Sequence, residues 1–254
     1  MLYDTHAHLN DHKFDGDRDE IIEKIKNSGV GLVNNIGADI KTSYESIALA
    51  EKYDFIYAVC GIHPSETGAL TEHDMETLYN MTKHEKVKAV GEIGLDYHYE
   101  DGPDSDTQRY WFRRQLELAK ENDLPVVIHD RESKHEAIDI LKESKIQKAV
   151  MHCFSGSAET AQELLKMGFY ISFTGVVTFK NAKKAVEALK RIPLERLFIE
   201  TDCPYMAPEP VRGTRNDSSN VIYIAEKYAE IKGVSTEEII DITCRNAKEF
   251  FNIP

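Results

Sequence analysis

The sequence predicts one (β/α)8 barrel, a TIM barrel, over residues 1–254. Two observations lead to this prediction. Short apolar runs rich in β-branched residues recur along the chain, and each is followed by a longer amphipathic stretch. Histidines and carboxylates follow most of these runs, and only a closed barrel gathers the carboxyl ends of all its strands on one face. A doubly wound open sheet is the alternative that periodicity leaves open, but it spreads these ends along a line.

The apolar runs are the predicted strands. They recur at intervals of roughly 20 to 40 residues, the length of a βα unit. In order they are Leu2–Asp4, Val30–Ile36, Phe55–Cys60, Val87–Val90, Val126–Ile128, Ala149–Met151, Tyr170–Phe173 and Leu197–Ile199.

The stretches between the runs are predicted to be helical. Asp17–Ser28 carries isoleucines at helical spacing, and Thr107–Asn122 carries a similar apolar face before Pro125. Near the end of the chain, Ser235 and Glu238 have the spacing of a capping box ahead of another apolar face.

Two segments, Tyr97–Asp106 and Tyr205–Ser219, are rich in Pro, Gly, Asp and Asn. We expect them to be functional loops, because long irregular connections in a compact domain are commonly functional. No internal repeat or Gly/Ser linker interrupts the alternation, so a single domain is predicted.

The composition is that of a soluble globular protein, with 41% hydrophobic and 30% charged residues. The first residues lack the pattern of a signal peptide, and no apolar run reaches the roughly 18 residues of a membrane span. The four cysteines are scattered, which favours reduced thiols in the cytoplasm. We therefore expect a cytoplasmic protein without a membrane partner, and a monomer is favoured.

The formal net charge of −13 restricts nucleic-acid binding. Proteins that bind DNA non-specifically are generally basic, because phosphate contacts dominate their affinity. Any nucleic-acid activity of this chain requires a local basic patch, bound metal ions or contact with only a few nucleotides.

The candidate metal ligands lie at the ends of the predicted strands. His6 and His8 have the spacing that places two imidazoles on one face of a strand. Each histidine alone is more commonly a packed core residue, but buried carboxylates such as Glu92 and Asp202 need a positive partner. A metal site satisfies them together, and its predicted ligands are His6, His8, Glu92, His129, His152 and Asp202.

The segments DTHAHL, CGIHP, AVGEIGLDY, PVVIHDR, MHCFSG, ETDCPYMAPEPVRGTRN and CRNAKEFF occur in this order. Together they resemble the TatD family of metal-dependent deoxyribonucleases, in the amidohydrolase-like superfamily, from Asp4 to Phe251. The resemblance implies a TIM barrel, one or two divalent ions, and 3′–5′ exonuclease activity on DNA. It also implies that the first ion is held by His6, His8, Glu92 and Asp202. Glu92 would bridge to a second ion held by His129 and His152.

The resemblance implies a mechanism in which a metal-activated water attacks phosphorus in line. Asp202 would take the proton of the water, Glu92 would bridge the ions, and His63 would contact the scissile phosphate or the leaving group. Candidate substrate-binding residues are Arg131, Arg212, Arg215, Tyr97 and Phe154, with Lys180 a weaker candidate; the alternatives are surface charge for the cations and packing for the aromatics.

Two further expectations concern residues beside the predicted ligands. Cys153 and Cys203 each follow a ligand directly, so strand alternation predicts that they face the barrel wall. Asp217 and Ser218 stand where the family usually has Glu-Pro, and we expect this departure to lie in a substrate-facing loop.

The same site suits other chemistry. Amidohydrolase-like barrels cleave amides, esters and phosphotriesters with similar ligands, so a small-molecule hydrolase is the main alternative. The end of the fourth strand carries Glu92 where a carbamylated lysine is common in that group, which favours phosphodiester cleavage. A non-catalytic nucleic-acid-binding protein is a third reading, opposed by the acidic charge and the complete ligand set.

The expected partner is DNA, as a single strand or at its ends. The resemblance implies Mg²⁺ or Mn²⁺ in function, whereas four imidazoles also suit Zn²⁺, Ni²⁺ or Fe²⁺ in the purified protein.

Overall fold

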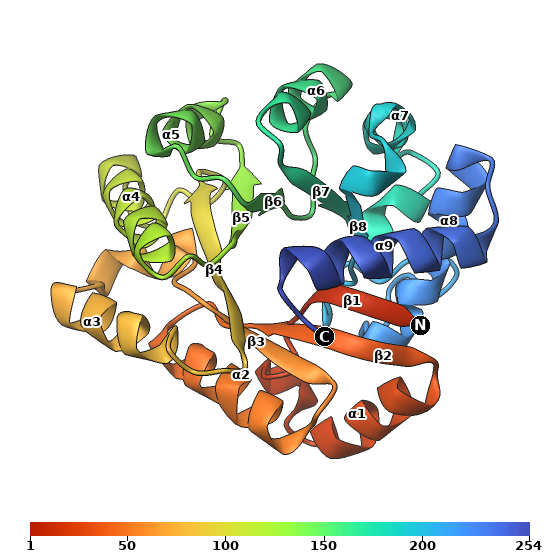
Figure 1. The fold of residues 1–254 in the computed structure, drawn as a ribbon, viewed down its shortest axis with the longest axis horizontal. Coiled ribbons are helices and arrows are strands. Elements are labelled where there is room, and N and C mark those ends of the chain that lie inside the picture. The colour runs from red at the N-terminus through yellow and green to blue at the C-terminus, as the bar shows by residue number, and fades with distance from the viewer.

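The computed structural model describes residues 1–254, and eight parallel strands alternate with helices along the chain (Figure 1). Each strand pairs with the next in sequence, in the order β1-β2-β3-β4-β5-β6-β7-β8. The strands are β1 (Leu2–Ala7), β2 (Val30–Ile36), β3 (Ile56–Cys60), β4 (Val87–Asp96), β5 (Val126–Arg131), β6 (Ala149–Met151), β7 (Tyr170–Phe173) and β8 (Leu197–Ile199).

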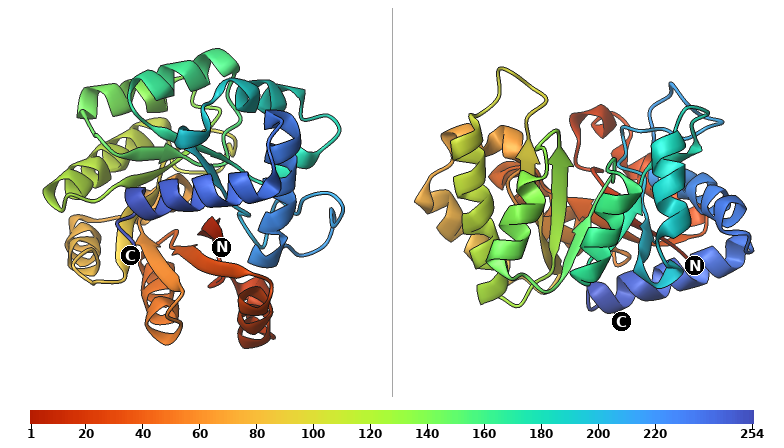
Figure 2. Two further views of the ribbon diagram at one scale, coloured as in Figure 1. Left: turned by 45° about the vertical axis from the view of Figure 1, so that its right-hand side comes forward. Right: turned by 90° about the horizontal axis from the view of Figure 1, so that it is seen from above.

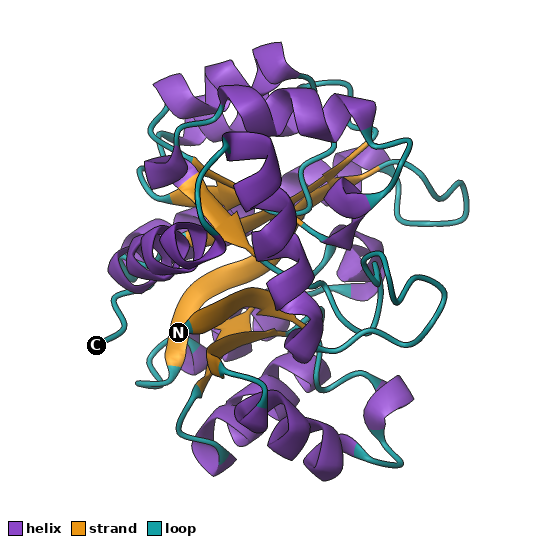
Figure 3. Ribbon diagram, turned by 90° about the vertical axis from the view of Figure 1, so that its right-hand side faces the viewer, coloured by secondary structure: helices purple, strands orange, loops and turns teal.

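The helices form the outer layer around these strands (Figures 2 and 3). They are α1 (Arg18–Asn27), α2 (Ile40–Lys52), α3 (Glu72–Met81), α4 (Ser105–Glu121), α5 (Glu136–Ser144), α6 (Ala158–Lys166), α7 (Lys183–Arg191), α8 (Val221–Lys232) and α9 (Thr236–Phe250). None of them combines the length and the apolar composition needed to cross a membrane.

The ring closes between β1 and the segment that follows β8. The backbone N–H of His8 donates to the carbonyl of Cys203 at 2.8 Å, and the N–H of Asp202 donates to the carbonyl of His6 at 2.8 Å. The predicted (β/α)8 barrel is therefore confirmed, and its closure places the ends of the first and eighth strands side by side.

Three strands are longer than the apolar runs that predicted them. β1, β4 and β5 continue through polar residues to Ala7, Asp96 and Arg131. Hydrophobicity marks only the part of a strand whose side chains pack in the core, whereas backbone pairing continues into the polar end. His6, Glu92 and His129 consequently lie within strands rather than after them.

The C-terminal helix closes the end of the barrel at which β1 begins. Tyr3 in β1 and Phe198 in β8 belong to one buried cluster with Phe250, the last residue of α9, and Phe251, which follows it. The Phe198 and Phe250 rings lie 5.3 Å apart. With this end sealed by aromatic packing, the carboxyl ends of the strands form the accessible face.

Candidate metal centre

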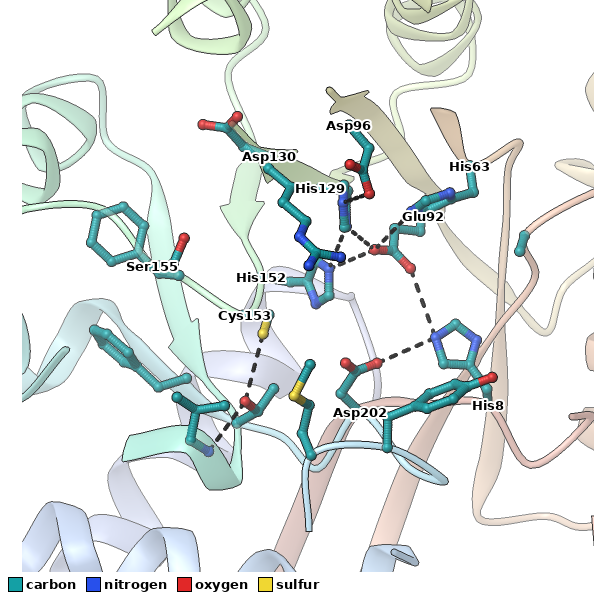
Figure 4. Close-up of a pocket in the computed structure, with 18 of the residues that line it drawn as sticks. His8, His63, Glu92, Asp96, His129, Asp130, His152, Cys153, Ser155 and Asp202 are labelled. Atoms are coloured by element: carbon teal, nitrogen blue, oxygen red, sulfur yellow. Dashed lines mark hydrogen bonds and ion pairs between the residues drawn. The ribbon is translucent and has the colours of Figure 1, made fainter. Parts of the chain in front are cut away.

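The six predicted metal ligands converge at the carboxyl end of the barrel, beside a cavity of about 740 Å³. Figure 4 shows Glu92 between the imidazoles of His8, His129 and His152, with Asp202 facing His8. They come from β1, β4 and β5 and from the residues that follow β1, β6 and β8: His6, His8, Glu92, His129, His152 and Asp202.

One group of ligands gathers His6, His8 and Asp202. The imidazoles of the two histidines approach one oxygen of the aspartate. Asp202 Oδ1 lies 3.7 Å from His6 Nε2 and 3.4 Å from His8 Nε2. The two Nε2 atoms lie 3.2 Å apart. This group provides two nitrogens and one oxygen at a single point, and we refer to it as position A.

The second group gathers Glu92, His129 and His152, and we refer to it as position B. Glu92 Oε1 lies 2.7 Å from His129 Nδ1 and 2.5 Å from His152 Nε2. The other oxygen of the same carboxylate, Oε2, lies 3.3 Å from His6 Nε2. Glu92 therefore directs one oxygen toward each position.

The hydrogen bonds of His8 test whether these residues suit a cation. Its Nδ1 lies 3.1 Å from the carbonyl oxygen of Ile36, which can only accept a hydrogen bond. Nδ1 of the neutral ring therefore carries the proton, and the lone pair on Nε2 faces the oxygens of Asp202 and Glu92. Acceptors that face acceptors in a buried site are stabilised by a bound cation, so the residues present fit a divalent metal ion.

The electrostatics of the centre keep its carboxylates ionised. Burial raises the pKa of Glu92, but the imidazoles of His152 and His6 outweigh burial and hold this pKa well below its usual range. Burial also raises the pKa of Asp202, but the interaction with His8 and the other imidazoles outweighs burial, and this pKa is lowered. Both groups are thus available as anionic ligands near neutral pH.

A buried carboxylate beneath the centre fixes the position of Asp202. Asp4 Oδ1 accepts the backbone N–H of Thr201 at 2.9 Å, and Oδ2 accepts its hydroxyl at 2.6 Å. Asp202 itself adopts a φ of +56°, a conformation that residues other than glycine rarely use. The tether from β1 therefore holds Asp202 in a strained conformation directed into the site.

Two carboxylates contact the ligands and were not predicted from the sequence. Asp96 Oδ2 accepts a hydrogen bond from His129 Nε2 at 3.1 Å, and Glu200 Oε1 lies 3.5 Å from His152 Nδ1. The spacing of Asp96, four residues after Glu92 on one strand, was the available signal, because it places both on the same face. Glu200 gave no comparable signal.

His63 lies beside position B rather than within it. Its Nδ1 accepts the backbone N–H of Ser65 at 3.2 Å, so Nε2 of the neutral ring carries the proton. Nε2 lies 3.9 Å from Glu92 Oε1, and the ring lies 4.5 Å from that of His129. Burial and the neighbouring His129 lower the pKa of His63 to about 4.

Of the five predicted substrate-binding residues, Arg131 and Phe154 line the cavity. Tyr97, Arg212 and Arg215 do not, because each has an intramolecular partner elsewhere. Tyr97 donates its hydroxyl to Glu136 at 2.9 Å, and Arg212 lies 4.0 Å over the ring of Phe179. Both terminal nitrogens of Arg215 bind the carboxylate of Asp17, at 2.9 and 2.5 Å.

The expectations for the residues next to the ligands need two corrections. Cys153 lines the cavity, because its φ of +44° interrupts strand alternation, and burial raises the pKa of its thiol to about 12. Cys203 is buried as expected, 3.8 Å from the hydroxyl of Ser218. Asp217 and Ser218 are buried away from the cavity, and Asp217 pairs with Lys24 of α1 at 2.6 Å.

Comparison with known proteins places this chain in a family. Residues 3–252 match the sequence model of the family described as TatD related DNase. The chain is 49% identical to an uncharacterized metal-dependent hydrolase of Bacillus subtilis, YabD, with full coverage of both chains. It is 35% identical to another, YcfH of Escherichia coli, covering 100% of this chain and 96% of the relative.

A solved structure agrees with the sequence relatives. The TatD homologue YJJV from Escherichia coli superposes with a TM-score of 0.94 at 30% identity, covering 100% of this chain and 98% of that one. The matched length, the barrel and the converging ligands lead to one conclusion: this chain is a metal-dependent hydrolase that belongs to the TatD-related DNase family.

Proposed function

We propose that this protein is a deoxyribonuclease that removes nucleotides from the 3′ end of single-stranded DNA with two divalent ions. The observation that carries the proposal is Glu92, whose two oxygens face two separate groups of ligands. A shared carboxylate between two ion positions is the arrangement that in-line phosphodiester hydrolysis uses.

The residues present would hold one ion at position A and one at position B, with Glu92 common to both. Bound there, a pair of divalent ions acidifies a water molecule and stabilises the charge on the phosphoryl oxygens. Magnesium or manganese would serve in function, although the four imidazoles also accept zinc, nickel or iron.

Asp202 is the proposed general base. It lines the cavity, and its Oδ1 faces the imidazoles of His6 and His8. Its Oδ2 has no partner within the protein and is free to accept the proton of the attacking water. The tether from Asp4 holds this carboxylate in place, so little reorganisation is needed during the reaction.

His63 is the proposed hydrogen-bond donor to the phosphate or to the leaving oxygen. The N–H of Ser65 occupies Nδ1, so Nε2–H is the end of the ring that remains available to the substrate. Because its pKa is lowered to about 4, the ring is neutral near pH 7 and donates without adding a positive charge beside the ions.

The remainder of the cavity suits a nucleotide. Phe154, Val177 and Ala185 are apolar residues of the cavity lining against which a base can pack, and Arg131 and Lys184 line the same cavity. These cations provide part of the local positive charge that a chain of net charge −13 needs to bind a polyanion.

We also propose that the protein acts in the cytoplasm as a monomer. All four cysteines are free, which suits a reducing compartment.

The test is cleavage of end-labelled single-stranded DNA, single-stranded RNA and a small ester by the purified protein. With Mg²⁺ or Mn²⁺ we expect stepwise shortening of the DNA from its 3′ end, and none with EDTA. Asp202→Ala and His129→Ala should each lower the rate at least about 100-fold. Asp130→Ala is the matched control, because this carboxylate lines the cavity without contacting a ligand. Ester turnover with inert DNA would overturn the proposal.

A further inference from the structure

The outer nitrogen of each ligand imidazole, the one turned away from the ions, has a different environment in the two positions. At position B both outer nitrogens face a carboxylate. His129 Nε2 donates to Asp96 at 3.1 Å, and His152 Nδ1 lies 3.5 Å from Glu200, outside hydrogen-bond geometry. At position A neither does. His8 Nδ1 donates to a backbone carbonyl, and His6 Nδ1 is buried without a partner.

This difference changes how strongly each imidazole binds a cation. A carboxylate that accepts the outer N–H fixes the tautomer, so that the inner nitrogen carries the lone pair, and it makes that nitrogen more basic. Asp96 therefore directs the lone pair of His129 Nδ1 toward Glu92 and His152. A neutral carbonyl, as at His8, fixes the tautomer but adds less charge.

The two outer carboxylates are held rigidly. Asp96 also accepts the backbone N–H of His98 at 2.9 Å, and its side chain is 3% exposed. Glu200 is 1% exposed and accepts the N–H of Cys153 and the hydroxyl of Ser172, both at 2.7 Å. Asp96 lines the cavity and Glu200 does not, but each carboxylate faces its imidazole directly.

We propose that the two metal positions are unequal, and that Asp96, with Glu200, makes position B bind divalent ions more tightly than position A. The inference rests on the two-ion part of the proposed function and does not depend on DNA as the substrate. Asp96 is a positioning residue, because it acts on the metal through His129.

A competing role for Asp96 would be to hold a third ion together with His63 and His129, whose ligand atoms cluster with it. The hydrogen bond of Ser65 to His63 Nδ1 argues against this role, because it leaves a proton on Nε2, which faces the cluster. His129 likewise uses Nε2–H to bind Asp96. The Asp96 carboxylate therefore has N–H groups around it rather than nitrogen lone pairs. It is placed to accept hydrogen bonds and not to share a cation with these imidazoles.

The experiment is a titration of the metal-free protein with Mn²⁺, in which free Mn²⁺ is measured by electron paramagnetic resonance. For the wild type we expect two classes of site, one ion each. Asp96→Asn should weaken the tighter class about 10- to 100-fold and leave the weaker class unchanged. Asn keeps an acceptor for His98, and circular dichroism checks the fold. Glu200→Gln should shift the same class by a smaller factor.

Two control variants assign the classes. Asp202→Asn should lose the weaker class alone, because this carboxylate serves position A. Asp130→Asn removes the same charge one residue from His129 and should leave both classes as in the wild type. The proposal fails if Asp96→Asn changes neither class or both equally, or if Asp130→Asn reproduces its effect.

The metal titration and the DNA-cleavage assay together distinguish failure of this inference from failure of the proposed function. Binding of a single ion by the wild type would overturn the two-ion mechanism and the inference together. Two classes of site in a protein that leaves DNA intact would overturn the deoxyribonuclease proposal alone.

Discussion

Asp4 combines full burial with three accepted hydrogen bonds at the base of the metal centre. Besides the two from Thr201, the backbone N–H of His6 donates to it at 3.3 Å. Burial raises the pKa of Asp4 to about 7, even though these donors act in the opposite direction. The carboxyl that organises Asp202 therefore changes its charge near neutral pH.

This raised pKa predicts a pH-dependent stability. The folded chain keeps a proton on Asp4 that the unfolded chain releases near pH 3.8. The stabilisation is therefore complete below about pH 4 and is lost as the pH rises to about 7. From about pH 5 to about pH 7 the metal-free wild type should lose roughly 2 kcal/mol relative to Asp4→Asn. Urea unfolding in EDTA measures this difference, and parallel pH profiles of the two proteins would contradict it.

At the same scale, the six ligand candidates were accessible from the sequence because each stands beside an apolar strand. Glu200 was not, and the spacing of Asp96 could place it on the face of Glu92 but could not show its role. That role depends on which ring nitrogen faces the carboxylate, and spacing carries no information on ring orientation. Arg215 is a residue that the sequence assigned to the substrate and that the structure pairs elsewhere. A guanidinium near a motif looks like a phosphate ligand until its partner Asp17, distant in sequence, is known.

At the scale of elements, helix and strand types followed from periodicity, while the strand ends did not. The apolar run at Val87–Val90 predicted β4, yet backbone pairing continues to Asp96 and carries Glu92 into the site. One half of the capping box expected at Ser235 is present, because the Ser235 side chain accepts the N–H of Glu238. Local patterns of this kind are readable because they involve neighbours in the chain.

The 3-10 helix η5 (Ser218–Asn220) allows a prediction at this scale. Asp217 caps it by accepting the N–H of Ser219 at 2.9 Å and also pairs with Lys24. Asp217→Ala should cost about 1–2 kcal/mol of stability, the usual loss for a cap. Lys24→Met should cost about 1 kcal/mol or less, because the lysine is 54% exposed and the ion pair is screened by solvent.

Asp217→Ser is the matched control, since its hydroxyl keeps the cap and loses only the ion pair. It should resemble Lys24→Met in urea unfolding, and none of the three variants should change KM, because neither residue lines the cavity. A raised KM for Asp217→Ala with unchanged stability would contradict this prediction and would show that the segment contacts the substrate.

At the scale of the whole molecule, the barrel was predictable because eight strand ends must meet for the ligands to converge. The distribution of charge around the opening of the cavity was not predictable from the sequence, since it depends on which loops stand on which side of the barrel. The loop between β4 and α4 carries Glu100, Asp101 and Asp104, and it rises on the side opposite the loop after β8 (Figure 2). Lys184, at the start of α7, lines the cavity, and α7 stands on the same side as the loop after β8 (Figure 2).

This uneven charge predicts the path of a bound strand. Lys180, Lys183 and Lys184 are exposed and have no ion-pair partner within the protein, so a single strand that leaves the cavity should cross them. Changing all three to Gln should raise KM for a long strand and lower the salt dependence of log KM by about 0.7 per lost phosphate contact. The KM for a dinucleotide, which can meet only Lys184 of the three because Lys184 alone lines the cavity, should rise by a smaller factor. The control replaces Lys26, Lys148 and Lys166, which are exposed at the opposite end of the barrel. Equal salt dependence in the two triple variants would show that net charge, and not the path of the strand, governs binding.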